Sequence, residues 1–103
     1  MTGRWNWELT GFRYLFTFNK NGTFSYYFKI GNSAAIAIGK YYTSGEKIYI
    51  TGLKSDSGTT NWANKVVEYK IGNDNIGTYL TASTLHPDDT YLKNNPNMKF
   101  RRY

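Results

Sequence analysis

Residues 12–30 read FRYLFTFNKNGTFSYYFKI, and this stretch decides the fold. Aromatic and aliphatic side chains occupy every second position on both sides of the central Asn21-Gly22 pair. A period of two places successive side chains on opposite faces of a strand, whereas a helix would scatter the same rings around its circumference. Asn-Gly also supplies the positive φ angles of a tight hairpin turn. The stretch therefore predicts two antiparallel strands that share one buried face.

Similar short segments follow one another along the rest of the chain. The predicted strands cover residues 5–10, 12–18, 23–30, 34–42, 47–53, 63–71, 78–82 and 90–93, with a ninth candidate at 98–103. Turn-forming residues separate them at 31–33, 44–45, 72–75 and 86–89, and 55–61 is the longest polar loop. Residues 34–38 (AAIAI) could compete as a helix, but they are flanked by glycines and are predicted as strand, with small side chains where the sheet curves or another backbone comes close.

The order of these strands predicts the architecture. Short antiparallel strands with hairpin connections form either a closed barrel or a two-sheet sandwich. Because long crossover connections are lacking, the sequence favours an all-β, small antiparallel up-and-down (meander) β-barrel of about eight strands. A length of 103 residues predicts a single domain over 1–103 with one modest core.

Composition narrows the class of protein. Aromatic residues make up 18% of the chain, which suits pleated, half-buried strands. The chain has no cysteine, so disulfides and thiolate metal sites are excluded. No run approaches the roughly 18 apolar residues of a membrane helix, and residues at the N-terminus do not resemble a signal peptide. Two localisations stay open: cytoplasmic, or exported or cell-surface with the signal removed.

The net charge of +6 is unevenly distributed. Lys93, Lys99, Arg101 and Arg102 place four positive charges in the last eleven residues, which contain no acid. The preceding residues carry a net charge of only +2. Any attraction to nucleic acid or to an acidic partner is therefore expected at the C-terminal end, although the same charges also suit an edge strand protected against aggregation.

Several motifs resemble those of a known family. Gly3-Arg4-Trp5 is similar to the glycine-x-tryptophan signature that opens lipocalins and other calycins. Residues 18–24 (FNKNGTF), 39–41 (GKY), 44–48 (SGEKI), 67–71 (VEYKI) and 79–81 (YLT) resemble, in order and spacing, small bacterial lipocalin-like domains. The resemblance implies that Trp5 plugs the closed end of the barrel and that Arg101 or Arg102 stacks on its ring by a cation–π contact. Trp7 shares the parity of Trp5 and is the rival for this plug.

The size of the barrel interior limits the size of the expected ligand. Eight short strands enclose a space that is either filled by side chains or able to hold one small ligand. The ligand is expected to be small, flat and apolar, or to sit at the open mouth against tyrosine hydroxyls. The candidate ligand-binding residues are Tyr14, Phe16, Tyr26, Phe28, Trp62, Tyr69 and Tyr79.

Catalysis finds little support in the residues. His86 is the only histidine and lies in a predicted turn beside Asp88 and Asp89. The acidic residues form no recognisable acid–base pair, and a metal site lacks a second nitrogen or sulfur ligand. We therefore expect a protein that is not an enzyme, without cofactor or metal.

Three function classes remain. The first is a non-catalytic, lipocalin-like binding barrel for a small hydrophobic or aromatic ligand. The second is a protein-interaction or inhibitor module that uses outward aromatic residues. Its candidate residues are Tyr27, Tyr41, Tyr42 and Tyr49. Self-association belongs to this class, and the chain is expected to be a monomer or a weak homodimer. The third is a single-stranded nucleic-acid binder that uses the basic C-terminal end, which is disfavoured because the basic residues do not follow the aromatic strands.

Overall fold

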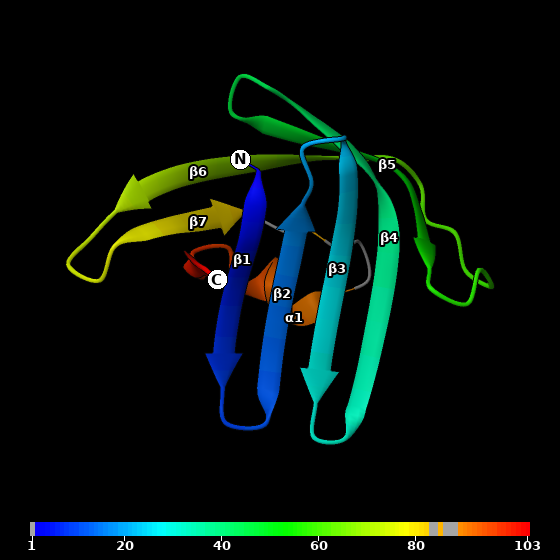
Figure 1. The fold of residues 1–103 in the computed structure, drawn as a ribbon, viewed down its shortest axis with the longest axis horizontal. Helices are drawn as coiled ribbons and strands as arrows, with labels where there is room; N and C mark the ends of the chain where they lie inside the picture. Colours follow the sequence, from blue (N-terminus) through cyan, green and yellow to red (C-terminus); the bar gives the residue numbers. More distant parts are fainter. Residues whose placement is uncertain (1, 83–84, 86–88) are drawn as a thin grey trace.

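The computed structural model describes residues 2–82, 85 and 89–103, and within them eight strands form one closed barrel (Figure 1). The strands are β1 Gly3–Leu9, β2 Phe12–Phe18, β3 Thr23–Ile30, β4 Ser33–Ser44, β5 Lys47–Ser55, β6 Lys65–Asn73, β7 Thr78–Ala82 and β8 Phe100–Arg102. A short helix, α1 Thr90–Asn94, lies between β7 and β8. Each strand pairs antiparallel with the next, and β8 pairs with β1. The predicted up-and-down barrel is confirmed.

The β2–β3 hairpin follows the sequence pattern closely. Its register pairs Phe12 with Ile30 and Phe18 with Phe24, so the alternating rings of both strands lie on the same face. The turn closes through the Asn19 amide, which donates to the Thr23 carbonyl at 2.9 Å. Gly22 has a φ of +88°, a conformation that favours glycine over residues with a side chain.

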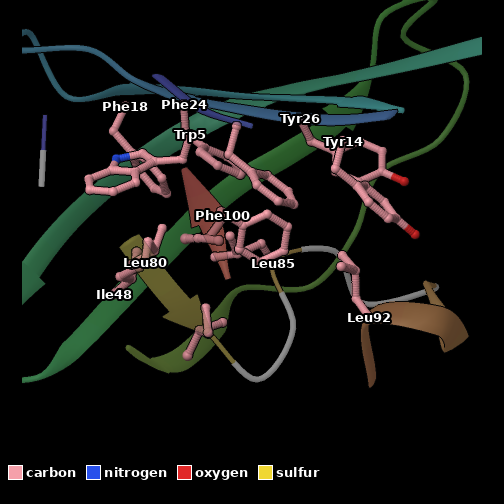
Figure 2. Packing of buried hydrophobic residues seen from close by; sticks show 14 of the residues in the cluster. Trp5, Tyr14, Phe18, Phe24, Tyr26, Ile48, Leu80, Leu85, Leu92 and Phe100 are labelled. Carbon is pink, nitrogen blue, oxygen red and sulfur yellow. The ribbon is translucent and has the colours of Figure 1, made fainter. Parts of the chain in front are cut away.

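The barrel interior is packed with its own side chains (Figure 2). Phe16 is 0% exposed, and the ring of Phe100 meets it edge-on at 5.0 Å between centroids. Figure 2 places Trp5, Phe18 and Phe24 toward one end of this core, and Tyr14, Tyr26 and Leu92 toward the other. Other large side chains that are fully buried among the described residues are Ile48, Ile50, Val67, Leu80 and Leu85. This buried cluster occupies the interior that the sequence left open between filling by side chains and one small ligand.

A bulge bends the β4–β5 pair. Ile38 pairs with Lys54 and Lys40 pairs with Thr51, so one extra residue lies on β5 between these pairs. Gly39 stands opposite the bulge, where an added Cβ would lie 2.9 Å from the Thr51 carbonyl oxygen. A close backbone approach therefore falls at Gly39, directly after the 34–38 segment.

The prediction of a strand at 90–93 is wrong. These residues form α1, which begins after Asp89, whose side chain accepts a hydrogen bond from the Leu92 amide at 3.0 Å. Such an N-cap satisfies one of the free amides at a helix start. Leu92 is buried in the barrel, so one apolar side chain anchors the helix. The eighth strand is instead formed within the ninth candidate, 98–103, and is shorter than predicted.

Two further observations concern His86 and membrane-spanning helices. The predicted turn at 86–89 includes His86, which lies outside the described residues. In the part of the chain that the structure describes, no helix is long and apolar enough to cross a membrane.

Candidate functional site: an aromatic cup at one end of the barrel

The end of the barrel next to α1 carries a shallow depression of about 340 Å³ that is largely open to solvent, which we call the aromatic cup. It is lined by Phe12, Tyr14, Tyr26, Phe28, Asp89, Thr90 and Tyr91. Strands β2 and β3 supply one wall of the cup. Their inward-facing positions continue from the buried core to Phe12 at the start of β2 and Phe28 near the end of β3. The first turn of α1 and its capping residue supply the other wall.

Ring contacts shape the cup around Phe12. Its centroid lies 5.1 Å from Phe28, 5.4 Å from Tyr14 and 5.4 Å from Tyr91, with interplanar angles between 59° and 76°. Trp7 flanks the cup from β1, with its ring 5.5 Å from Phe12 and 5.9 Å from Tyr91. Tilted and edge-to-face pairs of this kind are favourable beyond their buried area. The ring planes that line the cup are therefore inclined to one another. The Tyr91 side chain lies at the rim and is 42% exposed.

Asp89 is the polar group of the cup. The Tyr14 hydroxyl donates to its Oδ2 at 2.7 Å and lies 2.9 Å from its Oδ1. The Tyr26 hydroxyl donates to Oδ2 at 2.9 Å, and the Leu92 amide donates to Oδ1 at 3.0 Å. One carboxylate thus connects two barrel strands to the start of α1.

The two phenols act as neutral donors. Burial raises the pKa of Tyr14 and of Tyr26 far above the ordinary tyrosine value, and the hydrogen bonds and negative charge of Asp89 raise both further. Both hydroxyls therefore keep their protons throughout the ordinary pH range. Their protons point at Asp89, so a ligand in the cup meets their oxygens and rings rather than free donors.

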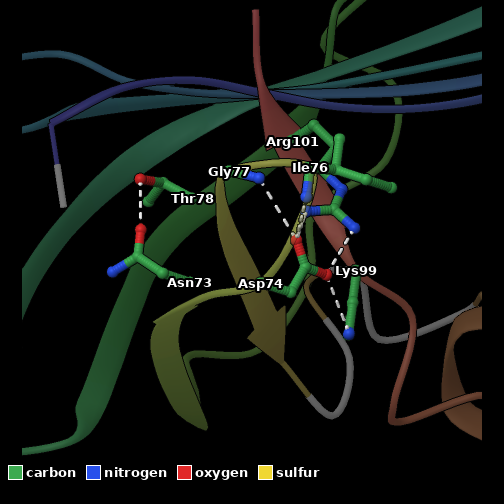
Figure 3. Close-up of polar contacts among 7 residues, drawn as sticks. All are labelled: Asn73, Asp74, Ile76, Gly77, Thr78, Lys99 and Arg101. Carbon is green, nitrogen blue, oxygen red and sulfur yellow. Dashed lines mark hydrogen bonds and ion pairs between the residues drawn. The ribbon is translucent and has the colours of Figure 1, made fainter.

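Asp89 differs from the acidic residue that forms the ion pairs of the barrel. Among residues 2–82, 85 and 89–103, the ion pairs found are those of Asp74 with Lys99 at 3.0 Å and with Arg101 at 2.7 Å (Figure 3). Asp74 also accepts from the amides of Ile76 and Gly77. The hydrogen bonds from Arg101 and Lys99 lower the pKa of Asp74, and Asp74 in turn raises the pKa of Arg101.

This Asp74 cluster changes the expectation for the basic C-terminal end. Two of its four basic side chains, Lys99 and Arg101, are paired with Asp74 and also lie over the Tyr79 ring, at 4.6 and 5.7 Å from its centroid. Arg102 donates to the Thr2 carbonyl at 2.8 Å. Three of the four charges that suggested a nucleic-acid surface, those of Lys99, Arg101 and Arg102, therefore make contacts within the barrel itself.

Trp5 and Arg102 form the contact that the calycin resemblance implied. Trp5 is completely buried, and the Arg102 guanidinium carbon lies 4.3 Å from its ring centroid. Arg101, the other candidate, pairs with Asp74 instead. Trp7, the rival for the plug, is only partly buried and packs beside the cup.

The predicted ligand-binding residues separate into two groups. Tyr14, Tyr26 and Phe28 come together in the cup. Phe16 is sealed in the core, and Tyr79 has the opposite parity from buried Leu80 and contacts the C-terminal cations. The remaining two predicted residues, Trp62 and Tyr69, lie away from the cup.

Tyr69 lines a different and more polar cleft. This cleft has a volume of about 690 Å³, and its lining includes Glu46, Lys47, Glu68 and Lys70. The Tyr69 hydroxyl lies 3.4 Å from the Gly45 carbonyl, to which it donates. Trp62 is partly buried, and its amide donates to the Leu53 carbonyl at 2.8 Å.

Sequence reasoning missed four residues of the cup: Phe12, Asp89, Thr90 and Tyr91. The parity that Phe12 shares with Tyr14 was a usable signal. Asp89 directly before Thr-Tyr-Leu was a usable N-cap signal as well. The contact between Tyr14 and Asp89 spans 75 positions, which no local pattern indicates.

Comparisons with known proteins give no further guide to the site. No family model, curated protein or solved structure matches this chain. Function is therefore inferred from the side chains that the barrel brings together at the cup.

Proposed function

We propose that this chain is a non-catalytic binding protein of lipocalin-like type, which holds a small hydrophobic or aromatic ligand in the aromatic cup. The observation that carries the proposal is the concave wall of rings around Asp89 at the end of an otherwise filled barrel. Ligand sites are typically apolar concavities with a few polar groups that orient the ligand. Rings supply the apolar wall here, and the carboxylate with its two phenols supplies the polar group.

The size of the cup limits the ligand. A volume of about 340 Å³ is at the lower end for small-molecule sites, which run from roughly 300 to 1,000 Å³. A ligand of about ten non-hydrogen atoms binds with about 4–6 kcal/mol when each atom contributes about 0.4–0.6 kcal/mol. The corresponding dissociation constants lie between about 1 mM and 40 μM.

The test is a titration with benzyl alcohol followed by amide resonances in ¹H–¹⁵N spectra. We expect the largest changes of amide chemical shift at the start of β2, at the end of β3 and in α1. Phe28→Ala removes one ring of the cup and should weaken binding about tenfold. Tyr69→Ala, in the separate cleft, is the matched control and should leave binding unchanged. Shifts confined to the Tyr69 cleft, or equal losses in both variants, would contradict the proposal.

A second candidate function is protein interaction through an outward aromatic patch. Tyr42 and Tyr49 are cross-strand neighbours whose rings stack at 4.6 Å and 5°, and exposed Val66 lies opposite Tyr49 on β6. Tyr41, which was grouped with them, instead packs against Phe18 and donates to the Asn19 carbonyl. Sedimentation velocity over a range of concentrations tests self-association through this patch. Tyr42→Ser should abolish any dimer that forms, and a dimer that persists would exclude the patch.

A further inference from the structure

The charge inside the cup points to the charge of its ligand. Asp89 places one carboxylate among the rings, and no cationic side chain of the described residues forms an ion pair with it. Asp74, in contrast, has two cationic partners on the barrel surface. An anionic group in a partly buried apolar site favours a positively charged neighbour.

The rings favour the same charge. The face of an aromatic ring carries negative electrostatic potential and attracts a cation within about 6 Å of its centroid. Phe12 packs against Phe28, Tyr14 and Tyr91 at 5.1–5.4 Å between centroids, so these rings form one continuous wall on which a cationic group can rest. Such a group would also lie close to the Asp89 carboxylate.

The hydrogen bonds of Asp89 narrow the class of cation. Its two oxygens already accept from Tyr14, Tyr26 and the Leu92 amide. A primary ammonium brings three N–H donors that need acceptors, and the acceptors left in the cup are the two phenol oxygens, the Thr90 hydroxyl and what remains of the Asp89 carboxylate. An alkylated ammonium brings methyl groups that pack on rings and needs only the electrostatic attraction of the carboxylate.

We infer that the aromatic cup binds an organic ammonium ion whose nitrogen is alkylated, with its methyl groups against the wall of rings and Asp89 as the counter-charge. This inference rests on the proposed function, since it specifies the ligand of the same cup. The basic residues nearest to the cup in the sequence are Arg13, Lys29 and Lys93, and none of them forms an ion pair with Asp89. Arg13, on adjacent β2, has the opposite parity and lies over the Tyr103 ring.

The experiment compares two probes of the same shape. Choline and 3,3-dimethyl-1-butanol differ in that a neutral carbon replaces the quaternary nitrogen. Both are titrated into the full chain while amide resonances of β2, β3 and α1 are followed. We expect choline to bind at least tenfold more tightly than the neutral alcohol.

Two variants assign the preference to Asp89. Asp89→Asn keeps a capping side chain with one acceptor oxygen but removes the charge. It should bring the ratio of the choline and alcohol affinities close to one. Glu68→Gln removes an equal charge in the separate cleft and should keep the preference. The comparison in the unaltered chain stands alone should Asp89→Asn fail to fold.

The outcomes separate the two claims. Equal affinities of choline and the alcohol at the cup would overturn the ammonium inference and support the proposed binding function. A preference for choline that survives in folded Asp89→Asn would also overturn the inference. Failure of choline, the alcohol and benzyl alcohol to shift any cup resonance at 50 mM would overturn the proposed function together with the inference.

Discussion

Replacing Asp89 with alanine should destabilise the whole barrel, although Asp89 lies outside every strand. The substitution leaves the buried hydroxyls of Tyr14 and Tyr26 without their acceptor and removes the cap of α1. Each unsatisfied buried hydroxyl costs about 1–3 kcal/mol, and loss of an N-cap costs about 1 kcal/mol. Water that enters the half-open cup lowers the first contribution, so we expect a loss of about 3 kcal/mol. A domain of this size has a free energy of unfolding of about 5–15 kcal/mol.

Urea unfolding followed by tryptophan fluorescence measures this loss as a lower midpoint at unchanged m-value. The Tm should fall by more than about 10 °C. Asp89→Asn keeps one acceptor and should cost less than half as much. In a Tyr14→Phe, Tyr26→Phe background, Asp89→Ala should cost at most about 1 kcal/mol, because the hydroxyls are already absent. Equal costs in both backgrounds would refute the hydrogen-bond reasoning, as would a cost below about 0.5 kcal/mol in the unaltered chain.

Three further predictions concern pH and backbone packing. The pKa values of Tyr14 and Tyr26 are raised on folding, so the stability that these residues contribute is complete below about pH 10. It is lost as the pH rises further, by up to about 1.4 kcal/mol per pH unit for each residue. Urea midpoints between pH 9 and 11 should therefore fall with pH, and Tyr→Phe at both positions should flatten this slope. The pKa of Asp74 is lowered on folding, so its contribution to the free energy of unfolding is present above about pH 4 and is lost as the pH falls. Asp74→Asn should reduce the dependence of the urea midpoint on acid pH. An unchanged dependence would exclude a role for Asp74. Gly39→Ala places a Cβ 2.9 Å from the Thr51 carbonyl oxygen and should cost about 1–3 kcal/mol, and a thermal melt without a shift would show that the bulge can relax.

The hairpin of β2 and β3 was predictable because every contact that forms it is local. The alternating rings and the Asn21-Gly22 turn act within 19 residues, and a one-residue slip would turn every ring toward solvent. The order of the strands follows from repetition of the same pattern. The short connections from β1 to β5 favoured a barrel, but the closing strand β8 follows α1 rather than a short turn after β7.

Helix α1 was not predictable from propensity. Thr90 and Tyr91 favour strands, and five residues are too few to form a stable helix alone. The helix exists because Asp89 caps it and Leu92 enters the barrel. The cap is local and was a usable signal, but the burial of Leu92 is a tertiary contact, and the strand propensity of Thr90 and Tyr91 indicated the wrong element.

The site was predictable only in part for the same reason. Tyr14, Tyr26 and Phe28 were identified because strand parity turns them inward. Asp89 and Tyr91 join them only once α1 has packed onto the end of the barrel. Likewise, Arg101 is joined to Asp74 across 27 positions, so the sequence showed an excess of positive charge without showing its partner.

The seam that closes the barrel also has a consequence for biosynthesis. Strand β8 has three residues and is joined by two residue pairs to β1 and by two to β7. Until this strand has left the ribosome, a nascent chain presents β1 and β7 as free sheet margins, which are templates for pairing with other chains. Removal of 100–103 should therefore yield insoluble assemblies rather than a smaller folded domain. The shortest strand would thus govern whether the protein accumulates in soluble form.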